Sequence, residues 1–131
     1  MKRVLLAEDD PFISDIYANQ LRRRGYIVDI AKNGQVVLEK IKNNFPELLI
    51  LDIHFNNASG QEIKPNGWEI LKIIRSDPVV KDLKVIVISN EPREGNIKNI
   101  SELGVLDYFV KIESSPEDIT NFTNKILDIK T

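Results

Sequence analysis

Short apolar runs alternate with longer segments of helical periodicity along the chain. Each run is too short for a helix and is bounded by polar residues, which is typical of buried strands. The expected strands lie at residues 4–7, 27–30, 48–51, 85–88 and 108–110. The run at 48–51 is continuously apolar, which indicates a strand covered on both faces. Strands that alternate with helices predict an α/β fold with a doubly wound, five-stranded parallel sheet.

Amphipathic helices are predicted between the strands, because apolar residues recur there three and four positions apart. Two helix starts carry a capping side chain followed by a proline, whose missing N–H costs nothing at that position. These pairs are Asp10–Pro11 and Ser115–Pro116. The apolar helix positions are Ile13, Ile16, Tyr17 and Leu21; Val37, Leu38 and Ile41; Ile70, Leu71 and Ile74; and Ile119, Phe122 and Ile126.

Two segments give weaker signals. A further helix at 95–103 rests on few apolar residues, and Gly104 would end it. The stretch 53–66 is long and rich in Asn, Gly and Ser, so we expect an irregular loop. Long loops inside compact domains often carry function.

Length and charge narrow the class of protein. The 131 residues fit one domain over 1–131, and we expect no output domain in this chain. A net charge of -2 gives no positive field for nucleic acid, and the absence of cysteine excludes thiolate chemistry. The N-terminal apolar run is too short for a signal peptide or a membrane span, so we expect a cytoplasmic protein with no membrane contact.

Polar residues follow the predicted strands at the edge where parallel sheets bind ligands. Carboxylates crowded at one edge repel one another, and oxygen ligands without a His or Cys cluster suit a hard cation such as Mg²⁺. A carboxylate beside that cation can attack phosphorus while an ammonium and a hydroxyl group neutralise and orient the phosphoryl oxygens. The residues in question are Glu8, Asp9 and Asp10, then Asp52, then Ser89 and Asn90, and finally Lys111.

The ordered set Glu8 and Asp9, Asp52, Ser89, and Tyr108 with Lys111 resembles the CheY-like receiver domain of two-component response regulators, over essentially the whole chain. The resemblance implies a flavodoxin-like strand order 2-1-3-4-5. It implies that Asp52 accepts a phosphoryl group from a sensor histidine kinase or a histidine phosphotransfer protein, and that Lys111 pairs with that group. Glu8, Asp9, Asp52 and the backbone carbonyl of His54 would bind Mg²⁺. Ser89 and Tyr108 would be the switch pair, and the region from the fourth helix to the fifth strand would bind a downstream effector.

The sequence departs from the receiver pattern at three places. Ile112 replaces the proline that usually follows the lysine through a cis bond, and a non-proline cis bond would cost about 2.5–4 kcal/mol. Phe55 and Asn56 replace the usual Met-Pro pair in a longer loop, which would shield the site, contact a partner or be a tolerated excursion. Asn90 replaces a small residue, so its amide would restrict access or bond the phosphoryl group.

Several candidate residues have simpler interpretations. We expect Asp10 to act as a helix cap, and Trp68 to pack at the start of the third helix. His54 is the sole histidine, and we expect its imidazole to be exposed and without a role.

Three other functions compete with a phosphorylated switch. A phosphatase with an aspartyl intermediate usually needs a second acid two residues after the nucleophile, where this chain has His54. A flavin-binding module would need a phosphate loop after the first strand, where Glu8 and Asp9 would repel phosphate. A pseudo-receiver that binds partners without phosphorylation stays open as the alternative. We expect a signalling switch rather than an enzyme, apart from its own phosphorylation and dephosphorylation.

Overall fold

The computed structural model describes residues 2–127. It contains one parallel sheet with strand order β2-β1-β3-β4-β5, which confirms the expected α/β class and the order 2-1-3-4-5. Every expected strand is present, and three of the five gain polar or charged residues at their ends. The strands are β1 (Arg3–Ala7), β2 (Ile27–Ala31), β3 (Leu48–Asp52), β4 (Lys84–Ser89) and β5 (Tyr108–Val110).

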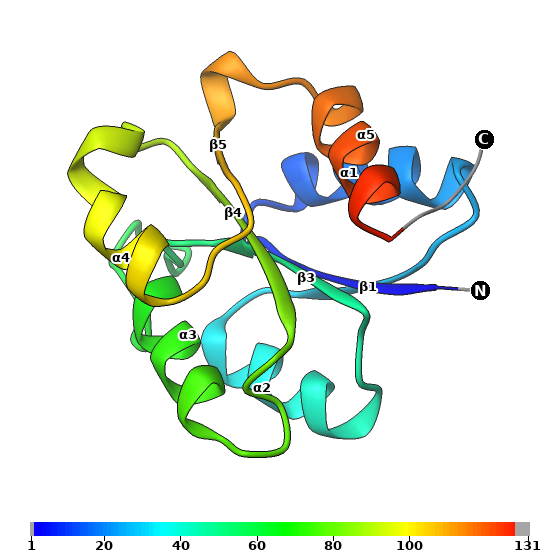
Figure 1. Ribbon diagram of the computed structural model, residues 1–131. Coiled ribbons are helices and arrows are strands. Elements are labelled where there is room, and N and C mark those ends of the chain that lie inside the picture. The colour runs from blue at the N-terminus through cyan, green and yellow to red at the C-terminus, as the bar shows by residue number, and fades with distance from the viewer. Residues whose placement is uncertain (1, 128–131) are drawn as a thin grey trace.

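Helices cover both faces of the sheet, as Figure 1 shows, with α1 and α5 on one face and the other helices on the opposite face. Alternate residues of each central strand point to opposite faces, so the strands contribute to two apolar cores. Leu49 and Leu51 pack towards α2 and α3, whereas Leu48 and Ile50 pack towards α1 and α5. The helices are α1 (Pro11–Arg23), α2 (Gly34–Asn43), α3 (Gly67–Ser76), α4 (Ile97–Glu102) and α5 (Pro116–Ile126).

The helix starts agree with the sequence expectations. The Asp10 carboxylate accepts hydrogen bonds from the backbone N–H groups of Phe12 and Ile13, which confirms its capping role. Ser115 caps α5 in a reciprocal pair with Asp118. The weak helix expected at 95–103 is a 3₁₀ turn at Arg93–Asn96 followed by the short α4. No helix within 2–127 combines the length and the apolar character needed to cross a membrane.

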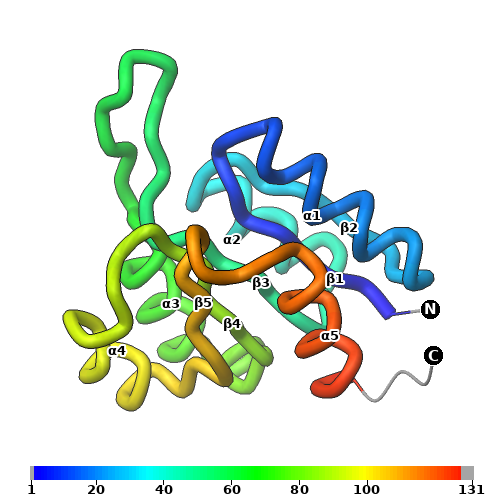
Figure 2. Tube along the Cα trace, turned by 90° about the horizontal axis from the view of Figure 1, so that it is seen from above, coloured from blue at the N-terminus to red at the C-terminus, as the bar shows by residue number. Residues whose placement is uncertain are grey.

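The segment 53–66 contains no regular strand or helix, as expected for an irregular loop, but its backbone folds into a hairpin-shaped excursion that projects from the carboxyl edge of the sheet (Figure 2). The backbone N–H of Ile63 donates to the carbonyl of Phe55 at 2.7 Å, and Asn56 forms an antiparallel bridge with Glu62. Gly60, with φ of +80°, supplies the left-handed residue of the turn. Phe55 is fully buried and anchors the base of this hairpin. We call residues 53–66 the hairpin below.

Candidate functional site

The strand register brings the expected site residues to one edge of the sheet. Asp52 ends β3 and lies opposite Ile88, so Ser89 follows one position further along β4. Ser89 in turn lies opposite Val110, so Lys111 follows at the end of β5. Ala7 lies opposite Leu51, so Glu8 is level with Asp52 on the other side. The side chains come from four separate segments, and sheet formation alone brings them together.

Lys111 forms two ion pairs in this site. Its Nζ donates to Glu8 Oε1 at 2.7 Å and to Asp52 Oδ2 at 2.9 Å, and both carboxylates are almost fully buried. Burial, together with the nearby Asp52, raises the pKa of Glu8 to about 9. Burial lowers the pKa of Lys111, but its attraction to Asp52 and its bonds to both acids outweigh burial and raise that pKa above its ordinary value. Glu8 is therefore held protonated near neutral pH, and Lys111 compensates the charge of Asp52.

Three carboxylates lie close enough to bind one metal ion. Oxygen atoms of Glu8, Asp9 and Asp52 all lie within 4.8 Å of one another, and oxygen-only ligands of this kind suit Mg²⁺. The hairpin holds one of them, because the backbone N–H of Asn56 donates to Asp9 Oδ2 at 2.7 Å. His54 donates its own backbone N–H to Asp52 Oδ1 at 3.3 Å, while the metal role of its carbonyl stays a prediction. The residues present thus fit a hard divalent cation.

Ser89 and Tyr108 meet at a residue that sequence reasoning missed. Ser89 is fully buried, and its Oγ accepts the backbone N–H of Glu91 at 3.0 Å. Tyr108 is also buried, and its hydroxyl donates to the carbonyl of Glu91 at 2.9 Å. Asn96 donates to the Tyr108 hydroxyl at 3.1 Å and accepts a bond from the Trp68 indole. Trp68 packs at the start of α3 as expected, and Glu91 joins the two candidate switch residues through its backbone.

The residues that depart from the receiver pattern leave this arrangement intact. Within 2–127 the one cis peptide is Lys64–Pro65, so the bond between Lys111 and Ile112 is trans. Lys111 begins a short 3₁₀ turn, Lys111–Glu113, and still reaches both acids. Asn90 is exposed just beyond the end of β4. The loop after β5 therefore positions its lysine without the proline.

The His54 imidazole is partly exposed, and it makes two contacts that the sequence did not predict. Its Nδ1 lies 3.1 Å from Glu62 Oε1 in the hairpin, and its Nε2 lies 3.1 Å from Glu91 Oε2 in the loop after β4. Partial burial lowers the pKa of His54, but the hydrogen bonds to Glu62 and Glu91 outweigh burial and raise it. The two partners are 8 and 37 positions away from His54 along the chain, so no local sequence motif predicts these contacts.

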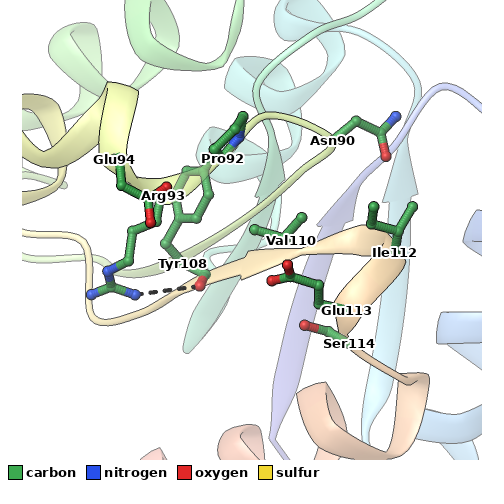
Figure 3. Close-up of a pocket in the computed structure, with 9 residues that line it drawn as sticks. All are labelled: Asn90, Pro92, Arg93, Glu94, Tyr108, Val110, Ile112, Glu113 and Ser114. Atoms are coloured by element: carbon green, nitrogen blue, oxygen red, sulfur yellow. Dashed lines mark hydrogen bonds between the residues drawn. The ribbon is translucent and has the colours of Figure 1, made fainter.

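A groove of about 430 Å³ lies beside the switch residues, between the loop after β4 and the turn after β5 (Figure 3). Arg93 closes one end by donating to the backbone carbonyl of Tyr108 at 3.4 Å, and it also pairs with Asp107. Ile112 lines the groove although 86% of it is exposed.

Comparisons with known proteins show a similarity to receiver domains over nearly the whole chain. The family model for the response regulator receiver domain matches residues 4–123. A receiver domain protein (CheY-like) from Methanospirillum hungatei JF-1 has a similar structure, with a TM-score of 0.82 and 26% identity, covering 98% of this chain and 94% of that one. The polar-differentiation response regulator DivK of Brucella anthropi is 23% identical over 127 residues, 97% of this chain and 98% of DivK.

Some relatives are much longer than this chain. A protein-glutamate methylesterase/protein-glutamine glutaminase of Trichodesmium erythraeum is 34% identical over 113 residues, which cover 83% of this chain. The matching region is 30% of that relative's length, and a similar enzyme of Bacillus licheniformis is also matched over 30% of its length. The similarity therefore concerns the receiver part of these proteins.

Proposed function

The chain belongs to the response regulator receiver family, and on that premise we propose that it accepts a phosphoryl group on Asp52 from a histidine kinase or a histidine phosphotransfer protein. The observation that carries the proposal is the convergence of Glu8, Asp52 and Lys111 from three strand ends. A receiver is a signalling switch rather than a classical enzyme, and it acts by changing which partners it binds.

The chemistry needs a nucleophile and a means of neutralising phosphoryl charge. A carboxylate oxygen of Asp52 forms the new P–O bond while the bond from phosphorus to the donor nitrogen breaks, and the donor histidine, which carries a proton on its other ring nitrogen, leaves as neutral imidazole. Lys111 is already within hydrogen-bond distance of Asp52, so its ammonium stabilises the transferred group. Mg²⁺ would neutralise further phosphoryl charge when held by Glu8, Asp9, Asp52 and the His54 carbonyl.

The switch would use Ser89 and Tyr108. The Ser89 hydroxyl is buried at the end of β4, one position beyond the residue paired with Asp52, and it would bond a phosphoryl oxygen. Each protein state would present a different arrangement around α4 and β5, and phosphorylation shifts the population in proportion to its differential contacts. The groove lined by Arg93, Tyr108 and Ile112 is the surface that a downstream effector would bind. In this proposal the donor and the effector are cytoplasmic proteins, and nucleic acid is not a direct partner.

Mass spectrometry of the intact protein tests the proposal. We expect incubation with acetyl phosphate and Mg²⁺ to add the mass of one phosphoryl group, and we expect chelation of Mg²⁺ to prevent it. Asp52→Asn removes the nucleophile and should abolish the gain, whereas Asp10→Asn alters only the neighbouring helix cap and should retain it. Absence of any mass gain in the wild type under saturating Mg²⁺ would instead favour a pseudo-receiver that binds partners without phosphorylation.

A further inference from the structure

The hairpin is internally bonded and should move as one body. The side chain of Asn57 accepts the backbone N–H groups of Ser59 at 2.9 Å and Gln61 at 3.0 Å, which closes the turn. The backbone N–H of Asn57 donates to the carbonyl of Gln61, and the pair formed by Ile63 and Phe55 continues the ladder. Buried Phe55 fixes the base to the apolar core. A displacement at the base is therefore carried to the tip.

The base of the hairpin contacts both parts of the proposed phosphorylation machinery. Asn56 donates its backbone N–H to Asp9, one of the candidate metal ligands. His54 lies between the carboxylates of Glu62 and Glu91, at 3.1 Å from each. His54 and Glu62 both belong to the hairpin, whereas Glu91 belongs to the loop after β4. The contact between His54 and Glu91 therefore joins two segments that the chain order keeps apart.

Glu91 is the point at which this connection meets the switch pair. Its backbone N–H is bonded to Ser89 Oγ, and its carbonyl accepts the Tyr108 hydroxyl. If the Ser89 hydroxyl turns to a phosphoryl oxygen, the Glu91 backbone loses that partner and its loop is free to shift. The Glu91 side chain is bonded to His54, so a shift of this loop changes the contact that holds the hairpin.

We infer that His54 is a positioning residue that couples the hairpin to the switch pair, so that phosphorylation of Asp52 moves the hairpin as well as the face around α4. The inference rests on the proposed function. It gives the chain a second surface that changes with its phosphorylation state, formed by the exposed tip at 57–61 of the projecting hairpin (Figure 2).

Distance measurement between two spin labels tests this coupling. The chain has no cysteine, so Ser59→Cys at the hairpin tip and Ser76→Cys at the end of α3 give two unique labelling positions, both exposed. We expect the distance distribution from pulsed electron paramagnetic resonance to shift when acetyl phosphate and Mg²⁺ are added. Intact mass measured on the same labelled sample reports whether Asp52 has been phosphorylated.

Two variants ask whether the shift runs through His54. Glu62→Ala removes the bond that orients the His54 imidazole towards Glu91, away from the acidic cluster, and should reduce the distance shift while the phosphoryl mass gain persists. Glu94→Ala removes another exposed carboxylate near Glu91, one with no bond to His54, and should retain the shift. A shift of full size in Glu62→Ala, or an unchanged distribution in a phosphorylated wild type, would overturn the coupling. A wild type that gains no mass would overturn the proposed function itself, and the coupling with it.

Discussion

Replacing Lys111 with methionine isolates the electrostatic cost of the acidic site. Methionine keeps most of the apolar stem of the lysine but lacks the ammonium that bonds Glu8 and Asp52 at 2.7 and 2.9 Å. Without it, the almost fully buried Asp52 carboxylate lies beside a protonated Glu8 and has no cation to compensate its charge. Breaking a buried ion pair by removing one partner costs about 3–5 kcal/mol, because the remaining charge is buried without compensation. Protonation of Asp52 in the variant relieves part of this cost, so we expect about 3 kcal/mol.

Urea unfolding followed by the fluorescence of Trp68, the single tryptophan, measures the loss. For 131 residues the entropy of unfolding is about 0.28 kcal/mol/K, so a 3 kcal/mol loss lowers the melting temperature by about 10 °C. Saturating Mg²⁺ should restore part of the stability of the variant, since a divalent cation supplies the missing positive charge. These measurements are made with a chelator present and then with excess Mg²⁺.

A double-mutant cycle separates charge from packing in this loss. Asp52→Asn removes the charge that Lys111→Met leaves uncompensated, so the double variant Lys111→Met/Asp52→Asn should regain most of the stability that Lys111→Met loses. If the lysine stem stabilised the fold by packing alone, the double variant would be as unstable as Lys111→Met. That outcome, or a loss below about 1 kcal/mol in the single variant, would refute the electrostatic reasoning.

Three further predictions concern positions around the site and the cores. Burial raises the pKa of Tyr26, whose hydroxyl donates to Asn124 at 2.6 Å. The stability that the protonated hydroxyl contributes is therefore present below about pH 10 and is lost as the pH rises through the higher folded-state pKa. The free energy of unfolding of Tyr26→Phe should depend less steeply on pH above about 10 than that of the wild type, and an unchanged slope would contradict this. Gly67→Ala should destabilise the fold by at least about 2 kcal/mol in urea, because its Cβ would lie 2.5 Å from the Asp52 carbonyl oxygen; Gly95→Ala, with open space around the added carbon, is the control. Phe55→Ala should cost about 3–5 kcal/mol and loosen the hairpin, which faster amide exchange at its base would report.

The fold and the edge of the sheet that carries the site could be predicted from the sequence because both follow from local patterns. Short apolar runs marked every strand, helical spacing marked most helices, and polar residues at strand ends marked where Asp52 and Lys111 would meet. The register that makes Glu8 level with Asp52 follows from parallel pairing of adjacent strands. The site residues were predictable as a set, although the resemblance to receivers supplied their individual roles.

The hairpin and its contacts could not be predicted because their signals are not local. Asn and Gly suggest a turn, yet only the buried Phe55 and the bridge between Asn56 and Glu62 turn the segment into a hairpin. His54 was expected to be exposed and without a role, since nothing in the sequence pairs it with Glu91, 37 positions away. Interactions of this kind depend on how loops from different strands approach one another after the sheet has formed.

Stability and function oppose each other at the carboxyl edge of this sheet. The two apolar cores stabilise the fold without any contribution from the acidic cluster, whereas Glu8 and Asp52 are held almost fully buried with one lysine to compensate them. Removing the Asp52 charge should therefore leave the protein at least as stable while ending phosphorylation, as expected where a site is kept for chemistry rather than folding. The burial of these charged groups also makes the site sensitive to phosphorylation. A bound cation or a transferred phosphoryl group changes the local charge that Lys111 compensates. The bonds from this edge to Ser89, Glu91 and His54 then give that change a route to the surface.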